Sequence, residues 1–171
     1  MYADKVVPAL QTWLESHRST LDERVFKPYR TKLGKIYPYE SQNIPSSAMP
    51  CLELGTVSWK KSWVASGFML EDLYQLAITG YVLWTDSEEN AKLILAFASE
   101  VSRLFELIAG QDIPVEGTNF RIHYHSEMPL ASGEIDYTLI GDAFVRSFRY
   151  EWVGYITRQA EIGESYCIDE P

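Results

Sequence analysis

The sequence is poor in the residues that build disulfides, metal centres and nucleophilic active sites. It contains two cysteines, Cys51 and Cys167, and three histidines in 171 residues. Two cysteines this far apart do not form a disulfide framework, and they lack the paired spacing of a zinc site. Neither has a histidine near it in the sequence, and no Gly-x-Ser-x-Gly motif occurs. We therefore expect a reducing, intracellular setting.

Long apolar runs and glycine-rich loops are also missing. No run of about eighteen apolar residues occurs, and residues 1–5 do not begin a signal peptide, so we expect a soluble protein without a membrane partner. Its glycines are scattered, and none sits in a strand-loop-helix motif that would hold a phosphate group. We expect no cofactor.

The sequence is rich in acidic and aromatic residues. Twenty-four acidic residues against fifteen lysines and arginines give a formal net charge of −9. Such a surface disfavours indiscriminate binding to nucleic acid or anionic lipid. Aromatic residues make up 13%, with five tryptophans and eleven tyrosines. This exceeds what a small core easily holds, so some rings are expected in protein interfaces.

Hydrophobic periodicity predicts two helices. Residues 1–25 carry an apolar stripe at steps of three and four residues, and His17 on this stripe is interpreted as a partly buried core histidine. The second helix is predicted over residues 87–109, with Asp86 as its N-cap and Glu89 completing a capping box. These two helices are expected to cover a sheet.

Alternation of apolar and polar residues predicts strands between residues 51 and 158. The expected strands run from Cys51 toward Trp59, over 73–85, over 115–126 and over 142–158. Residues 26–50 contain several prolines and no periodicity, which predicts a long loop, and residues 159–171 are expected to form an acidic tail.

These elements predict one domain over residues 1–171. Its expected class is α/β (α+β), with two layers: a mixed, mainly antiparallel sheet of about four strands, covered by the N-terminal and central helices. A chain of this length can form its own core.

The order of the predicted elements resembles a known family. An amphipathic helix precedes a proline-bounded entry from Ile44-Pro45 into the first strand. A hairpin then returns through residues 74–82, a helix follows Asp86-Ser87-Glu88-Glu89, and a strand pair ends in residues 144–156. Over roughly residues 1–158 this order is similar to that of the tail terminator (tail completion) proteins of long-tailed bacteriophages.

The resemblance implies a structural virion protein, made in the host cytoplasm and located in the phage tail. Such a protein forms a ring, expected here to be a hexamer, that caps the tail tube and offers a docking surface to the head or neck. Its implied partners are other copies of itself, the tail tube protein and a head–tail connector or neck protein. DNA passes through without sequence-specific binding. The resemblance implies no enzymatic activity.

A subunit of a closed ring needs two different surfaces that meet head to tail. The end of the first hairpin is the first candidate, because exposed apolar side chains at a strand connection gain little unless a partner covers them. The side chains concerned are Trp59, Trp63, Val64, Phe68 and Met69. The alternative is that Trp59 and Phe68 fold back onto the sheet as a lid.

The loop at residues 36–50, with Ile44 and Pro45, is the second candidate surface. A proline-rich segment loses little conformational entropy when it docks. The alternative is that this loop only connects the first helix to the sheet.

One pattern suggests a metal site. On a strand, His123, His125 and Glu127 share one face at intervals of about 7 Å. Two imidazoles and a carboxylate are a suitable set for zinc or iron. The alternative is a polar, solvent-facing strand edge.

A basic segment suggests phosphate contacts. Five basic residues alternate with Phe26 and Tyr29, an arrangement suited to the backbone of a passing DNA molecule. They are Arg24, Lys27, Arg30, Lys32 and Lys35. The alternative is a solvated loop whose long side chains lie along the surface.

Two other functions remain open from the sequence. One is a cytoplasmic protein–protein interaction (adaptor) domain without catalysis. The other is a metal-dependent enzyme that uses His123 and His125.

Overall fold

A computed structural model describes residues 3–39, 43–63, 69–108, 112–118, 121–124, 135–141 and 143–159. These residues form three α-helices, three short helical turns and seven strands. The helices are α1 Ala3–Ser16, α2 Arg18–Leu21 and α3 Glu88–Ile108, and the turns are η1 Asp22–Phe26, η2 Lys27–Tyr29 and η3 Ser46–Ala48. The strands are β1 Ile36–Tyr37, β2 Cys51–Trp63, β3 Met69–Leu83, β4 Ile113–Pro114, β5 Arg121–Tyr124, β6 Ile135–Ile140 and β7 Ala143–Gln159.

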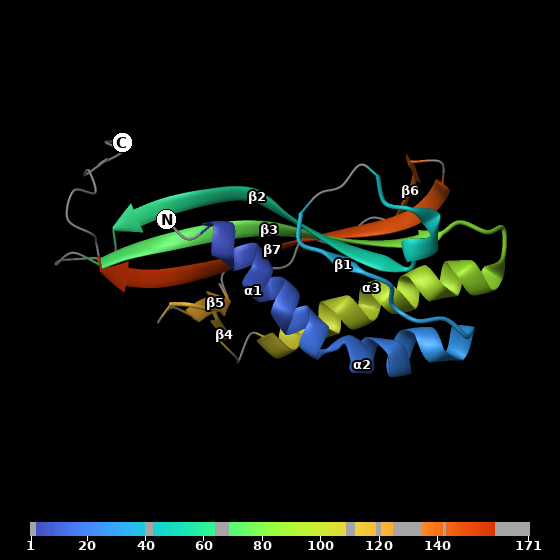
Figure 1. Cartoon of the computed structure of the whole chain (residues 1–171), viewed down its shortest axis with the longest axis horizontal. Coiled ribbons are helices and arrows are strands. Elements are labelled where there is room, and N and C mark those ends of the chain that lie inside the picture. The colour runs from blue at the N-terminus through green and yellow to red at the C-terminus, as the bar shows by residue number, and fades with distance from the viewer. Residues whose placement is uncertain are drawn as a thin grey trace.

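Three long strands, β2, β3 and β7, form the centre of the sheet (Figure 1). The strand order is β1-β2-β3-β7-β5-β4, and β6 pairs with the first residues of β7, away from the part that pairs with β5. Only β1 and β2 are parallel; the other described pairs are antiparallel. The prediction of a mixed α/β chain with a mainly antiparallel sheet is therefore confirmed. The count of about four strands is wrong, because the described residues alone contain seven.

The N-terminal helical region is broken where one helix was expected over residues 1–25. Helix α1 buries an apolar stripe that includes Val6, Leu10 and Leu14, and a turn at His17 separates it from α2. The chain then continues through η1 and η2 as far as Tyr29. Here the wider π-type turn η1 and the tighter 3₁₀-type turn η2 take the place of a regular α-helix.

Helix α3 begins at a serine. The side-chain Oγ of Ser87 accepts a hydrogen bond from the backbone N–H of Asn90 at 3.1 Å. This is the bond that an N-cap makes to the third helical residue. Ser87 therefore caps the helix in place of Asp86, which the sequence suggested.

Aromatic side chains join the helices to one face of the sheet. The Phe97 ring of α3 lies 4.8 Å from the Phe26 ring and 5.0 Å from the Phe148 ring, both edge to face. Rings of this size and geometry contribute both buried area and favourable edge contacts. Figure 1 shows the three helices on the same side of the long strands.

A smaller apolar cluster lies on the opposite face. It contains Ile44, Cys51, Tyr81, Ala143 and Val145, with Ala48 and Met49 packed against it. Residues 26–50, predicted as a long loop, thus contain η2, β1 and η3, and their second half covers part of the sheet.

Both arms of the first hairpin extend into the region predicted as its tip. Strand β2 continues to Trp63 and β3 begins at Met69, and they pair up to Trp63 and Leu70. Within the strand expected over 115–126, the described residues 115–118 lie outside any strand and residues 121–124 form β5, while β6 lies in an expected loop. No helix within the described ranges is long and apolar enough to cross a membrane.

Candidate functional site

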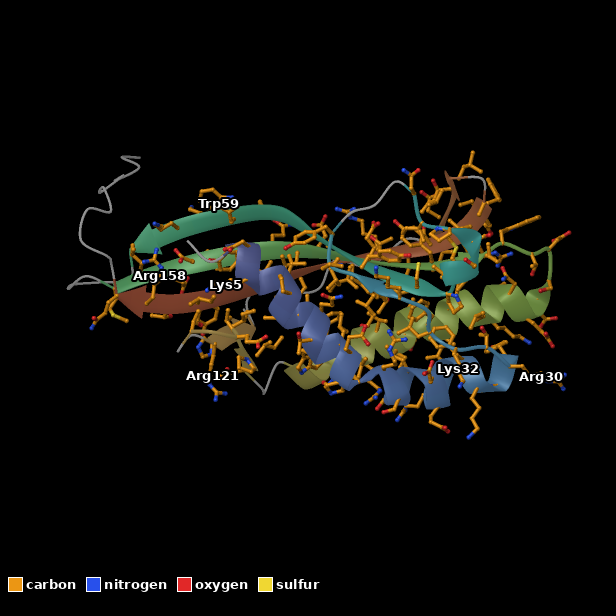
Figure 2. The ribbon with its side chains drawn as sticks, viewed as in Figure 1. Lys5, Arg30, Lys32, Trp59, Arg121 and Arg158 are labelled. Carbon is orange, nitrogen blue, oxygen red and sulfur yellow. The ribbon has the colours of Figure 1, made fainter. Side chains whose placement is uncertain are left out.

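The predicted hairpin surface contains one exposed tryptophan that the structure describes. Trp59 is 53% exposed on β2 and is paired with Tyr74 of β3 (Figure 2). A register shift between Thr56 and Ser58 inserts an extra residue into β2, so Trp59 shares the face of Tyr74 instead of the opposite face. Its exposure favours an interface over a lid.

Among the other predicted hairpin residues, the structure describes the side chain of Met69 alone. Met69 begins β3 and is half-buried. Trp63 ends β2, but its side chain is outside the described part, as are Val64 and Phe68.

The second predicted surface is divided between core and solvent. Ile44 is 1% exposed and belongs to the cluster with Cys51 and Tyr81, whereas Pro45 is exposed. A side chain this deeply buried has no surface left for a partner. Ile44 therefore belongs to the core, which neither the docking surface nor the simple connector considered from the sequence includes.

Only one of the three predicted metal ligands, His123, lies in the described residues. His123 lies on β5, where its Nδ1 is 2.7 Å from the Asp112 carboxylate and its ring is 5.1 Å from the Tyr155 ring. His125 and Glu127 lie outside the described residues. Within the described ranges no group of three His, Cys, Asp or Glu side chains could hold a metal ion.

The predicted phosphate-contacting residues are mostly paired with acids or rings. Arg24 forms an ion pair with Glu100 at 3.2 Å, Lys27 forms one with Glu23 at 2.8 Å, and Lys35 lies 4.9 Å from the Tyr37 ring centre. These contacts reduce the charge that is available to a phosphate backbone.

Arg30 and Lys32 remain exposed and line an open depression with Asp22, Glu23 and Lys27. Figure 2 shows Arg30 and Lys32 at one end of the molecule and Trp59 toward the other end. The two acids in the same depression weaken its attraction for an anion.

An apolar surface that the sequence did not indicate lies where β6 meets the start of β7. We call it the β6–β7 patch. Its four side chains are 38–64% exposed: Trp84, Tyr137, Leu139 and Phe144. Leu139 and Phe144 are cross-strand partners, and the Trp84 ring meets the Phe144 ring edge to face at 5.8 Å. Contiguous exposed rings of this kind mark interaction surfaces in folded proteins.

Arg146 lies next to the β6–β7 patch on β7. It is paired in register with Tyr137, and its guanidinium lies 5.3 Å from the Tyr137 ring centre. The residue is only 8% exposed, and its Nε has no hydrogen-bond partner. No carboxylate in the described part of the chain forms an ion pair with Arg146. The sequence signal is an arginine in phase with Phe144 and Phe148 on the same strand.

A second arginine on the same face of β7 is paired. The Nε of Arg158 donates a hydrogen bond to the Asp72 carboxylate at 2.7 Å, and the two side chains are 1% and 4% exposed. A buried ion pair with this geometry compensates both charges. Arg146 therefore differs from Arg158 in having no acid beside it among the described residues.

The exposed apolar side chains at Trp59 and in the β6–β7 patch are of the kind found at interaction surfaces. No protein-family model matches the sequence, and a search of curated proteins found no match.

Proposed function

We propose that this chain is a ring-forming structural protein of a phage tail, a tail terminator that caps the tail tube and provides the docking surface for the head or neck. It acts by assembly and not by catalysis. The observation that carries the proposal is a pair of unlike apolar surfaces on one sheet, Trp59 on β2 and the β6–β7 patch. A head-to-tail ring needs two such different surfaces.

The two surfaces are well separated. Trp59 lies opposite Tyr74, which pairs with Gly154, and the β6–β7 patch begins at Phe144 on the same strand, β7. Phe144 precedes Gly154 by ten positions along β7, which corresponds to a distance of about 33 Å between the two residues. A neighbour bound at one surface thus leaves the other accessible to the next subunit.

The strand edges support the same proposal. β1 pairs only with Leu52 and Glu53, so no described strand pairs with residues 54–60 of β2 on that side. β6 pairs with β7 alone among the described strands. Unpaired edges form hydrogen bonds with strands of another chain. The two-layer arrangement predicted from the sequence belongs to this proposal, with the sheet edges facing neighbouring subunits.

A cytoplasmic adaptor domain is the second candidate function. The β6–β7 patch favours it equally, because aromatic rings beside a buried arginine also suit a single protein partner. The two functions differ in symmetry: a tail terminator closes into a ring, whereas an adaptor does not need to.

Light scattering after size exclusion tests the proposal over a range of protein and salt concentrations. We expect a single species near six subunits for the unmodified chain, and rings by electron microscopy. The double variant Leu139→Ser, Phe144→Ser should shift the mass to the monomer. Leu95→Ser is the matched control, since Leu95 is 58% exposed on α3. A monomer or dimer at every concentration contradicts the ring and favours the adaptor.

A further inference from the structure

Next to the β6–β7 patch lies Arg146, whose positive charge the described residues do not neutralise. Arg146 is more than nine-tenths buried, its Nε has no hydrogen-bond partner, and its one described interaction is with the Tyr137 ring. Taking a guanidinium out of water is costly unless a carboxylate and hydrogen bonds replace the water. Among the described residues, the one partner of the guanidinium is the Tyr137 ring, and this cation–π contact is weaker.

The occupant of such a site combines a carboxylate with apolar side chains. The carboxylate would neutralise Arg146, and the apolar side chains would cover Trp84, Leu139 and Phe144. The chain carries this chemistry in residues 160–171, which we call the acidic segment. It has four acids, Glu161, Glu164, Asp169 and Glu170, no lysine or arginine, and three large apolar residues, Ile162, Tyr166 and Ile168.

We propose that the β6–β7 patch and Arg146 bind the acidic segment of a second copy of this chain. The inference rests on the proposed function, because it names the contact that joins neighbouring subunits. Arginine suits this role, since its planar group binds both oxygens of a carboxylate at once.

Chain length favours a second copy over the same copy. The acidic segment follows Gln159 at the end of β7, and Arg146 lies thirteen residues back along that strand, about 43 Å away. Fully extended, the chain from Gln159 to Glu170 spans at most about 38 Å, and to Glu164 about 17 Å. The acids of one subunit therefore meet the Arg146 of its neighbour more readily than their own.

A mixing experiment with two full-length variants separates binding between copies from a structural role of Arg146. The first variant, Arg146→Met, keeps the acidic segment but lacks the receiving charge. The second, the neutral-segment variant, keeps Arg146 and carries Glu161→Gln, Glu164→Gln, Asp169→Asn and Glu170→Gln. Each variant alone should be a monomer by light scattering.

Mixing the two variants in equal amounts should give a one-to-one pair. The segment of the first variant can bind Arg146 of the second, but the reverse contact is absent, so growth stops at two subunits. If Arg146 were only structural, or bound its own segment, the mixture would stay monomeric, and this result would overturn the inference. Thermal unfolding followed by circular dichroism checks that both variants are folded.

A labelled synthetic peptide of residues 160–171 provides a second measurement. It should bind the neutral-segment variant by fluorescence anisotropy, and Arg146→Met in the same background should weaken binding at least tenfold. Arg146→Lys should weaken it to an intermediate degree and covers the case in which Arg146→Met does not fold. Equal binding with and without Arg146, or no binding, overturns the inference.

The inference and the proposed ring fail in different ways. If the unmodified chain forms a six-subunit ring and both variants form it unchanged, the ring stands and the inference falls. If the unmodified chain is monomeric at every concentration, the proposed ring falls. In that case the peptide measurement alone decides whether the Arg146 site exists.

Discussion

At the scale of single residues, the smaller apolar cluster around Ile44 keeps two weakly acidic side chains, Cys51 and Tyr81, in their neutral forms. Burial raises the pKa of the Cys51 thiol from 9.0 to about 12, and the nearby Glu53 carboxylate adds to the effect. Burial likewise raises the pKa of the Tyr81 hydroxyl, whose O–H donates a hydrogen bond to Glu53 at 3.0 Å. Both groups are neutral and compatible with burial at neutral pH.

These shifts predict a loss of stability at alkaline pH. A group whose pKa is raised on folding contributes its full stability below its unfolded pKa and loses it as the pH rises toward the folded value. For Cys51 this window is between pH 9 and about 12. Each such group steepens the fall of the unfolding free energy by up to about 1.4 kcal/mol per pH unit.

Thermal unfolding between pH 8 and 11 measures this effect. Cys51→Val removes the thiol and keeps an apolar side chain of similar size, so its Tm should fall less steeply with pH than that of the unmodified chain. Identical slopes for the two proteins would show that Cys51 does not ionise during alkaline unfolding.

At the scale of elements, the contact between β3 and β7 depends on a glycine. Gly80 lies opposite Phe148, and a Cβ added at Gly80 would overlap the Phe148 ring. That ring packs on Phe97 of α3, which in turn packs on Phe26 of η1. A displaced Phe148 therefore disturbs the packing of three elements.

We predict that Gly80→Ala lowers the free energy of unfolding by about 1–3 kcal/mol, the usual cost of overfilling a core. Urea unfolding measures the change. Phe148→Leu removes part of the ring, so the double variant Gly80→Ala, Phe148→Leu should lose less than the sum of the two single losses. Strict additivity would contradict the overlap.

Helices and strands with a strong hydrophobic period could be predicted from the sequence. Strands whose position depends on pairing with a distant strand could not. The 3.6-residue apolar period located α3 to within a residue or two, and alternation located β3 and β7. β1 was missed because two residues carry no period, and β6 was missed because none of its residues is buried, so neither face has a clear apolar alternation. The bulge at Thr56/Ser58 depends on register, which a single sequence does not reveal.

The candidate surfaces show the same limit. Trp59 was expected at a surface because it lies toward the end of the first hairpin, and it is exposed. Tyr137 and Leu139 were overlooked because they lie in a segment predicted as a loop. Arg146 was missed, because its phase on the strand is its only sequence signal and because whether an acid lies beside it depends on how distant segments come together.

At the scale of the whole molecule, two arginines on the same face of β7 are expected to have opposite effects on stability. Arg158 compensates Asp72 near one end of the strand, whereas Arg146 has no acid beside it among the described residues near the other. In the proposed assembly, Arg146 gains its partner only when a second copy binds. The isolated subunit then carries an uncompensated charge for the sake of assembly, a trade-off common at binding sites.

Arg146→Met should therefore raise the unfolding free energy of the isolated subunit, by about 1–3 kcal/mol, because it replaces an uncompensated buried charge with an apolar side chain. Arg158→Met is the matched control and should lower it by about 3–5 kcal/mol, since it leaves the Asp72 carboxylate buried without its ion-pair partner. Urea unfolding in the neutral-segment background, which is expected to be monomeric, measures both values. A loss for Arg146→Met as large as that for Arg158→Met would mean that Arg146 already has a partner in the isolated chain, and the site would then have no charge to offer a second copy.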